Sequence, residues 1–142
     1  MTVIHIFSHK PEMIERYIEK EHAKFTGGEH YTIVKFYTMD AKQQKDMLSK
    51  YKDKSDEIVY IIGAYSEGII PFATKSIYLK ISFDTFLEYR ISKDILDITR
   101  NSEKCKKDVL SEKINITISK AYYKKIYEYW DRIYSVYDIV KM

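Results

Sequence analysis

Three carboxylates, Asp40, Glu67 and Asp84, follow segments of the chain that favour β-structure. Carboxylates in such places could hold a magnesium ion, which prefers oxygen ligands, or accept a hydrogen bond from a sugar hydroxyl. The alternative, which we favour, makes Asp40 and Asp84 helix caps and leaves Glu67 as a solvated loop residue. These residues are therefore candidates for ligand binding whose roles depend on the elements around them.

Lys10 is a fourth candidate, in the loop Ser8-His9-Lys10-Pro11 after the first predicted strand. In many nucleotide-binding α/β proteins, a glycine-rich loop at this place wraps phosphate with its backbone N–H groups. This loop contains no glycine, and Pro11 lacks an N–H donor. Glu12 adds a negative charge where phosphate would lie. Of the usual phosphate-binding side chains, only Lys10 and Ser8 remain, in the wrong order and spacing.

Apolar, β-forming runs alternate with amphipathic patterns along the chain. The spacing predicts strands over residues 2–7, 31–38, 57–64, 76–83 and 114–118. It predicts helices over residues 11–24, from Asp40 to about Lys54, from Thr85 to about Asp97, and from Ser119 through Tyr137. Asp40 with Gln43, and Thr85 with Glu88, have the spacing of capping boxes. Residues 65–75 are predicted as a short helix or a loop.

This alternation predicts an α/β fold. Strands that alternate with helices form βαβ units, and we expect three layers with a mainly parallel sheet of four to five strands between helices. The nearly continuous apolar run at residues 57–64 fits a strand buried on both faces. With no linker and no internal repeat, the 142 residues predict a single domain, 1–142. Ligands of such sheets bind at the carboxyl edge of the strands.

The fourth predicted strand and its helix read IYLKISFDTFLEYRISKDILD, residues 77–97. This segment resembles the part of uridine kinases, and of other P-loop nucleoside or nucleotide kinases, in which an "LKIFVDT" strand leads into an arginine-bearing helix. The matching residues are Leu79-Lys80-Ile81, Phe83-Asp84-Thr85, Arg90 and Lys93-Asp94. The preceding IVYIIGAYSEGII, residues 58–70, is similar to the family's "VIVEG" strand and turn. The resemblance implies a P-loop-kinase-like topology.

The resemblance also implies roles for several residues. Asp84, Arg90 and Lys93 would lie near the reacting groups, and Arg90, Lys93 and Arg100 would bind phosphates from the lid region. The family's phosphate loop, G-x-x-x-x-G-K-[ST], is absent, and kinase catalysis relies on that loop for positioning and charge stabilisation. We therefore predict a degenerate kinase-like scaffold that has lost catalysis by the family's route and needs no cofactor.

The chain has 14 tyrosines and a net charge of +3, and the charge is unevenly placed. The basic excess lies in residues 100–125, which contain eight basic and three acidic side chains. Without a base-reading motif this segment predicts a solvated connector, and nucleic acid is not an expected partner. The final predicted helix has a broad aromatic side that includes Tyr122, Tyr129 and Trp130. Aromatic residues are enriched at interface cores, so this helix is a candidate surface for a protein partner. The alternative is that its aromatic side chains belong to the core.

Other chemistry is excluded or weakly supported. Cys105 is the single cysteine, so the chain cannot form an intrachain disulfide, and the four histidines lack metal-ligand spacing. We expect no metal site. No signal peptide or membrane-spanning run is apparent, which predicts an intracellular protein without membrane contact. The composition favours residues with A/T-rich codons, such as Ile, Lys and Tyr. This fits an A/T-rich bacterium, archaeon or large DNA virus, so association with a virion is an alternative.

Two hypotheses for function follow. The first is a non-catalytic structural or protein-interaction protein on a degenerate nucleotide-kinase-like scaffold. The second is an enzyme acting on nucleotides or other phosphate esters through Asp84, Arg90 and Lys93. The first predicts a filled sheet edge and an exposed apolar surface elsewhere. The second predicts an open pocket that brings together Asp40, Glu67, Asp84 and Arg90.

Overall fold

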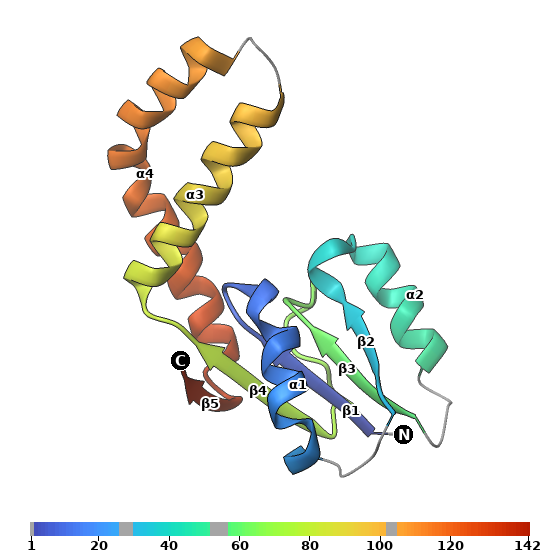
Figure 1. Ribbon diagram of the computed structural model, residues 1–142. Helices are drawn as coiled ribbons and strands as arrows, with labels where there is room; N and C mark the ends of the chain where they lie inside the picture. Colours follow the sequence, from blue (N-terminus) through green and yellow to red (C-terminus); the bar gives the residue numbers. More distant parts are fainter. Residues whose placement is uncertain (1, 26–29, 52–56, 102–104) are drawn as a thin grey trace. The chain divides into compact units, whose positions relative to one another are not determined.

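The computed structural model describes residues 2–25, 30–51, 57–101 and 105–142 (Figure 1). The chain divides into two compact units. One comprises residues 1–80 together with 132–142, and the other comprises residues 81–131. The single domain over residues 1–142 stays a prediction, made because the sequence contains no linker and no internal repeat.

A sheet of five parallel strands forms the centre of the first unit. The strands are β1 (Thr2–Phe7), β2 (Thr32–Lys35), β3 (Ile58–Ile62), β4 (Lys75–Lys80) and β5 (Asp138–Lys141). Their order is β2-β3-β1-β4-β5, and Ile4 at the centre of β1 lies beside Tyr60 of β3 and Lys75 of β4. The predicted α/β fold with a parallel sheet is confirmed. In Rossmann and flavodoxin-like sheets β1 is next to β2, whereas here β3 separates them.

Both faces of the sheet are covered. Successive residues of β1 point to opposite faces, and each face packs against a different helix. Ile4 and Ile6 pack with Ile14 and Ile18 of α1 (Ile14–Phe25), which follows a 3₁₀ turn at Pro11–Met13 and lies across the sheet in Figure 1. On the opposite face, Val3 packs with Leu48 and Tyr51 of α2 (Ala41–Tyr51). Two apolar clusters, one on each side, therefore hold the three layers together.

The connection from β3 to β4 contains no helix. Parallel strands are usually joined by a crossover helix, but residues 63–74 cross from β3 to β4 as an irregular loop. The loop contains a tight turn in which the Gly68 N–H donates to the Tyr65 carbonyl at 2.8 Å. Thr74 then joins the start of β1, because its N–H donates to the Val3 carbonyl at 2.7 Å. Tyr65 and Ile70 of this loop fill the core on the α2 side of the sheet.

The second unit is a pair of antiparallel helices, α3 (Phe83–Asn101) and most of α4 (Cys105–Tyr134) (Figure 1). Phe83 and Phe86 of α3 pack against Tyr127 of α4, each with ring centroids 5.6 Å apart. The Tyr127 hydroxyl donates to the Ile81 carbonyl at 2.6 Å, and the Tyr123 hydroxyl donates to Asp94. Aromatic rings whose hydroxyls are bonded thus join the two helices.

Several predicted boundaries are wrong. Residues 114–118 lie inside α4, so the β-branched residues of INITI are overridden by the helix around them, and the fifth strand is β5 instead. The strand predicted over 76–83 ends at Lys80. The predicted Thr85–Glu88 capping box is replaced by Ser82, whose Oγ accepts a hydrogen bond from the Thr85 N–H at 3.2 Å.

The second strand is also shorter than predicted. β2 ends at Lys35, and Phe36–Thr38 form a 3₁₀ turn. The capping box at Asp40 is confirmed, since Asp40 Oδ1 accepts from the Gln43 N–H at 2.8 Å and Gln43 Oε1 accepts from the Asp40 N–H at 3.0 Å. The helix it opens ends at Tyr51, and the predicted end near Lys54 lies outside the described residues.

Candidate functional site

A buried aromatic cluster lies against the carboxyl half of β1 on the α2 side of the sheet. It consists of His5, Phe7, His9, Tyr78, Tyr134 and Tyr137, all of them buried. The rings of Phe7 and Tyr134 are stacked with centroids 3.9 Å apart, and Tyr78 lies 5.4 Å from Phe7. Side chains from β1, β4 and the carboxyl-terminal end of the chain therefore fill space near the edge where open α/β sheets bind ligands.

The first loop is packed into this aromatic cluster. Ser8 is 2% exposed, and the ring of His9 lies 5.2 Å from Phe7 and 5.9 Å from Tyr78. Ser8 Oγ accepts a hydrogen bond from the Lys10 N–H at 3.1 Å, so the serine hydroxyl closes its own loop. Lys10, a predicted ligand-binding residue, is half-buried at the start of the 3₁₀ turn. A phosphate loop needs backbone N–H groups aimed into an open space, whereas the Lys10 N–H is bonded to Ser8 Oγ within this loop.

His5 is the polar centre of the aromatic cluster. Its Nε2 lies 2.8 Å from the Gly63 carbonyl, which can only accept a hydrogen bond, so Nε2 must carry the proton. In the neutral ring Nδ1 is then an acceptor, and the Tyr137 hydroxyl, 2.7 Å away, donates to it. This assignment satisfies both ring nitrogens and ties the chain before β5 to the central strand.

Burial sets the protonation state of this network. Desolvation lowers the pKa of His5 to about 4, and the hydrogen bond to the Gly63 carbonyl offsets the shift only in part. Burial also raises the pKa of Tyr137, against hydrogen bonds from the Ile70 N–H and the Ser76 hydroxyl. At neutral pH both groups are uncharged, so the aromatic cluster is held by neutral hydrogen bonds. Such a pair is poorly suited to acid–base catalysis near neutral pH.

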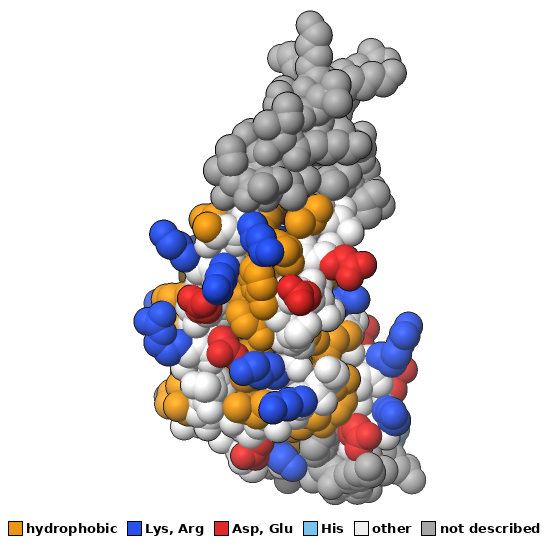
Figure 2. Space-filling model, turned by 90° about the vertical axis from the view of Figure 1, so that its left-hand side faces the viewer, with side chains coloured by type: hydrophobic (Ala, Val, Ile, Leu, Met, Phe, Trp, Pro, Cys, Tyr) orange, Lys and Arg blue, Asp and Glu red, His pale blue; other side chains and the backbone are white. Residues whose placement is uncertain are grey.

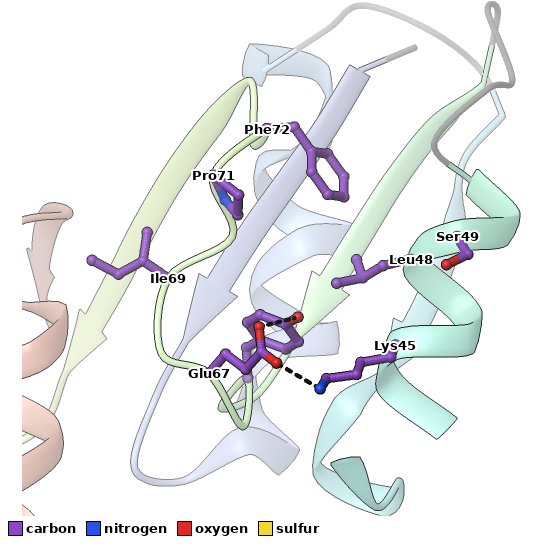
Figure 3. Close-up of a pocket in the computed structure, with 8 residues that line it drawn as sticks. Lys45, Leu48, Ser49, Glu67, Ile69, Pro71 and Phe72 are labelled. Atoms are coloured by element: carbon purple, nitrogen blue, oxygen red, sulfur yellow. Dashed lines mark hydrogen bonds and ion pairs between the residues drawn. The ribbon is translucent and has the colours of Figure 1, made fainter. Parts of the chain in front are cut away.

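An open pocket lies between α2 and the β3–β4 loop (Figure 3). Its volume is about 510 Å³, within the range of small-molecule sites. It is lined by Lys45, Leu48, Ser49, Tyr65, Glu67, Ile69, Pro71 and Phe72. Figure 3 shows Phe72 at one end of the pocket and the Lys45–Glu67 pair at the other. Ile69 and Phe72 are 42% and 36% exposed, so the loop leaves apolar surface open where a crossover helix would usually lie.

Gln44 positions the loop that carries Glu67. Its buried side chain donates from Nε2 to the carbonyls of Phe36 at 2.9 Å and Ala64 at 3.2 Å. Its Oε1 accepts from the Ser66 N–H at 2.8 Å. One amide thus joins α2, the 3₁₀ turn and the loop, and satisfies backbone groups that irregular structure leaves unpaired. Sequence reasoning missed Gln44, because glutamine on a helix gives no signal of burial.

The polar end of the pocket is an ion pair. Lys45 Nζ lies 2.7 Å from Glu67 Oε1, and the Tyr65 hydroxyl donates to Glu67 Oε2 at 3.3 Å. The hydrogen bond and charge of Lys45 lower the pKa of Glu67, and Glu67 in turn raises the pKa of Lys45. Burial, followed by the Glu67 charge, raises the pKa of Tyr65. At neutral pH Glu67 is a carboxylate whose charge Lys45 already offsets.

The predicted site residues have separate environments. Asp40 caps α2, and neither Asp40 nor Lys10 lines the pocket that contains Glu67. Asp84 is exposed in the first turn of α3, where its negative charge interacts favourably with the helix dipole. The cap of this helix is Ser82. Lys45, which is bonded to Glu67, was missed because an exposed lysine on a helix gives no sequence signal of a partner.

The basic candidates are on α3. Arg90 Nε lies 3.6 Å from Asp94 Oδ1, one helical turn away, and Lys93 Nζ lies 5.8 Å from the centre of the Tyr89 ring. The side chain of Arg100 lies outside the described residues. Arg90 and Lys93 each contact a neighbour on their own helix, and the Arg90 Nε is buried without a hydrogen-bond partner among the described residues.

α4 carries exposed aromatic side chains. Tyr122 and Tyr129 are 63% and 54% exposed, and Trp130 is half-buried with its ring 5.1 Å from that of Tyr129. Ile126, between the two tyrosines, is half-buried. We call Tyr122, Ile126 and Tyr129 the tyrosine face. Figure 2 shows hydrophobic side chains on the molecular surface with lysine, arginine and acidic side chains beside them.

Two further types of site find no support in the described part of the chain. Among those residues, no three His, Cys, Asp or Glu side chains gather as a metal site would require. None of the helices, over the residues that the structure describes, combines the length and apolar character needed to cross a membrane.

No protein-family model matches the sequence, and no curated protein is detectably similar to it. One solved structure similar to this chain is that of an uncharacterized protein from Eubacterium ventriosum ATCC 27560. The two are 15% identical, with a TM-score of 0.44 over 100% of this chain and 88% of the other.

Proposed function

We propose that this protein is a non-catalytic structural or interaction protein, built on a degenerate nucleotide-kinase-like scaffold. The observation that carries the proposal is the buried first loop. At the place where a phosphate loop would be open, Ser8 is buried and the ring of His9 is packed against Phe7 of β1 and Tyr78 of β4. A nucleotide could bind there only after this packing was broken. Breaking buried contacts costs more free energy than moving a solvated loop.

Two observations support the kinase-like scaffold. The segments at residues 58–70 and 77–97 resemble nucleoside kinases, and they correspond to β3 with most of its loop and to β4 with most of α3. The strand order also differs from the Rossmann and flavodoxin-like orders, because β1 lies between β3 and β4. Both observations support a kinase-like sheet over the Rossmann and flavodoxin-like alternatives.

The interaction role rests on the tyrosine face. Tyrosine is enriched at protein interfaces, since a large rigid ring contributes contact area while its hydroxyl can stay solvated. Tyr122 and Tyr129 are more than half exposed, although Tyr123 and Tyr127 of the same helix are buried. α4 therefore offers two large rings that the chain does not use for its own core.

A thermal-shift titration tests the non-catalytic part of the proposal. Purified protein is heated with ATP, GTP, nucleosides and monophosphates, with and without magnesium. A ligand that binds the folded state raises its apparent stability with concentration, and we expect no saturable shift at millimolar ligand. A clear shift that disappears when Ser8 or Lys10 is replaced by alanine would overturn the proposal.

The second candidate function is an enzyme that acts on nucleotides or other phosphate esters, and the pocket beside Glu67 favours it. That pocket joins apolar walls to a lysine, a carboxylate and a phenol. The same titration separates this candidate, because ligand shifts would then be lost in Lys45→Ala and retained in Ser8→Ala. Lys42→Ala, an exposed lysine of the same helix, is the matched control.

A further inference from the structure

The tyrosine face has the spacing of a helix-packing seam. Tyr122, Ile126 and Tyr129 are separated by four and then three residues. At 3.6 residues per turn this spacing places all three side chains in one narrow stripe along α4. In heptad terms they occupy positions d, a and d, which are the positions that insert into a facing helix. A partner helix would meet this stripe as anchors three and four residues apart.

The two borders of the stripe differ. On one side stand Tyr123 and Trp130, which are buried and half-buried. On the other side stands Lys125, an exposed residue in the g position that commonly forms interhelical ion pairs. Lys120 and Lys124, farther from the seam, are also exposed, and Glu128 is the one exposed acid among residues 120–130. The accessible border of the seam therefore carries Lys125, and the surface behind it is mainly basic.

This charge decides between a partner and a second copy of the chain. Two antiparallel copies packed seam to seam would place their Lys125 side chains together, and two parallel copies would place Lys125 opposite the aromatic border of Tyr123 and Trp130, so neither arrangement gives the lysine an acidic partner. A helix with acidic residues at its e and g positions would instead pair with Lys125 and gain from the local positive field.

Charge alone would also attract nucleic acid, but the geometry favours a helix. Tyr122 and Tyr129 are two turns apart, about 10 Å along the axis. Successive nucleotides rise about 3.4 Å per base, so neighbouring bases could not stack on both rings. The aliphatic Ile126 between the rings suits an apolar side chain and offers no stacking surface.

We propose that the tyrosine face binds an amphipathic helix of a partner protein, with apolar side chains at its a and d positions and acidic side chains at e and g. The proposal rests on the interaction role given above and specifies the partner's chemistry. The rings of Tyr122 and Tyr129 supply the central contacts, and Lys125 selects the acidic flank.

A peptide selection on the full chain tests this proposal. The probe is a displayed library of helices about four heptads long, with Leu, Ile, Phe or Tyr at a and d and Glu, Lys, Gln or Ser at e and g. We expect selected peptides to be enriched in Glu at e and g. Their affinity should fall about tenfold or more for Tyr122→Ala/Tyr129→Ala and for Lys125→Glu. Lys42→Glu, an equivalent change on an exposed residue of α2, should leave the affinity unchanged.

The remaining outcomes each overturn a defined statement. Peptides that need the two tyrosines but carry neutral or basic flanks overturn the acidic partner and leave the interaction role standing. Peptides whose binding ignores both tyrosines, or a selection that yields no binder, overturn the interaction surface itself. A fluorescent oligothymidylate that binds the wild type and not the tyrosine variant replaces the helix with nucleic acid. Circular dichroism of each variant confirms that it is folded before its affinity is compared.

Discussion

Tyr134 and Tyr129 belong to the same helix, yet they lie in opposite environments. Tyr134, in the aromatic cluster, is 0% exposed, stacks on Phe7 and has both hydrogen-bonding roles of its hydroxyl satisfied. Tyr129, on the tyrosine face, is 54% exposed. The difference shows that residue type says little about role in a chain with 14 tyrosines, and that burial and partners assign it. Four predictions test this contrast.

The largest effect is expected for Tyr134→Ala. The change removes a fully buried ring and leaves a cavity between Phe7, His5 and Tyr137, whose rings lie 3.9 to 5.7 Å from it. Large-to-small changes of core aromatics cost roughly 3–5 kcal/mol in the free energy of unfolding. Urea unfolding measures the loss. Phe86→Ala, which removes a buried ring in the second unit, is the comparison that shows whether the loss is specific to the aromatic cluster. A loss below about 1 kcal/mol would show that the aromatic cluster is not part of the core.

The pH dependence of stability should report the buried His5. Because its pKa is about 4 in the folded chain and 6.5 in the unfolded chain, the unfolded state binds more protons between these values. The contribution of His5 to the free energy of unfolding should therefore be fully present above about pH 6.5 and should be lost as the pH is lowered toward 4. The loss attributable to His5 is about 3 kcal/mol.

Urea unfolding at several pH values, compared with His5→Gln, isolates this contribution from that of the carboxylates. The variant should lose the His5 part of the slope, whereas His30→Gln, at an exposed position, should keep it. Equal slopes for the wild type and His5→Gln would contradict the assignment of His5 as buried and neutral.

A smaller effect is expected for Tyr137→Phe. The ring stays in place, but Nδ1 of His5 loses the hydroxyl that donates to it at 2.7 Å. An unsatisfied buried acceptor costs about 1–3 kcal/mol. Differential scanning calorimetry measures the decrease in Tm, with Tyr129→Phe as the matched removal of an exposed hydroxyl. If both variants lose the same stability, the hydrogen bond in the aromatic cluster makes no special contribution.

The sequence predicted local structure better than it predicted meetings between distant segments. Asp40 with Gln43 was predicted as a cap because both partners lie within one turn. The strand β5 was missed because Asp138–Lys141 is short, largely exposed and without alternation. Residues 114–118 were assigned to a strand because β-branched side chains favour one, although propensity is weak against the long helix that contains them.

The candidate sites show the same limit. Glu67 was named as a loop acid, but its partner Lys45 comes from a helix 22 residues earlier, and only the fold brings them together. The burial of His5 depends on Tyr134 and Tyr137, more than 120 residues away along the chain, so no local pattern could reveal it. Tyr122 and Tyr129 were named as part of a broad aromatic side that could meet a partner, because helical periodicity is local information, and both are more than half exposed.

The smallest effect on stability is expected on the tyrosine face, and it is the sharpest test of the contrast. Tyr129→Ala removes contacts of a half-exposed ring, but alanine has the higher helix propensity, and the two effects oppose each other. The free energy of unfolding should change by less than about 0.5 kcal/mol, against several for Tyr134→Ala in the same helix.

The same Tyr129→Ala variant should lose affinity for the selected acidic helix, measured by fluorescence anisotropy. Stability and binding would then separate in opposite directions at two positions of α4: Tyr134 would matter for folding, and Tyr129 for the partner. A large loss of stability in Tyr129→Ala would show that the ring belongs to the protein's own packing. The exposure of Tyr129 would then no longer support an interface, because the need for this ring in folding would already explain its presence.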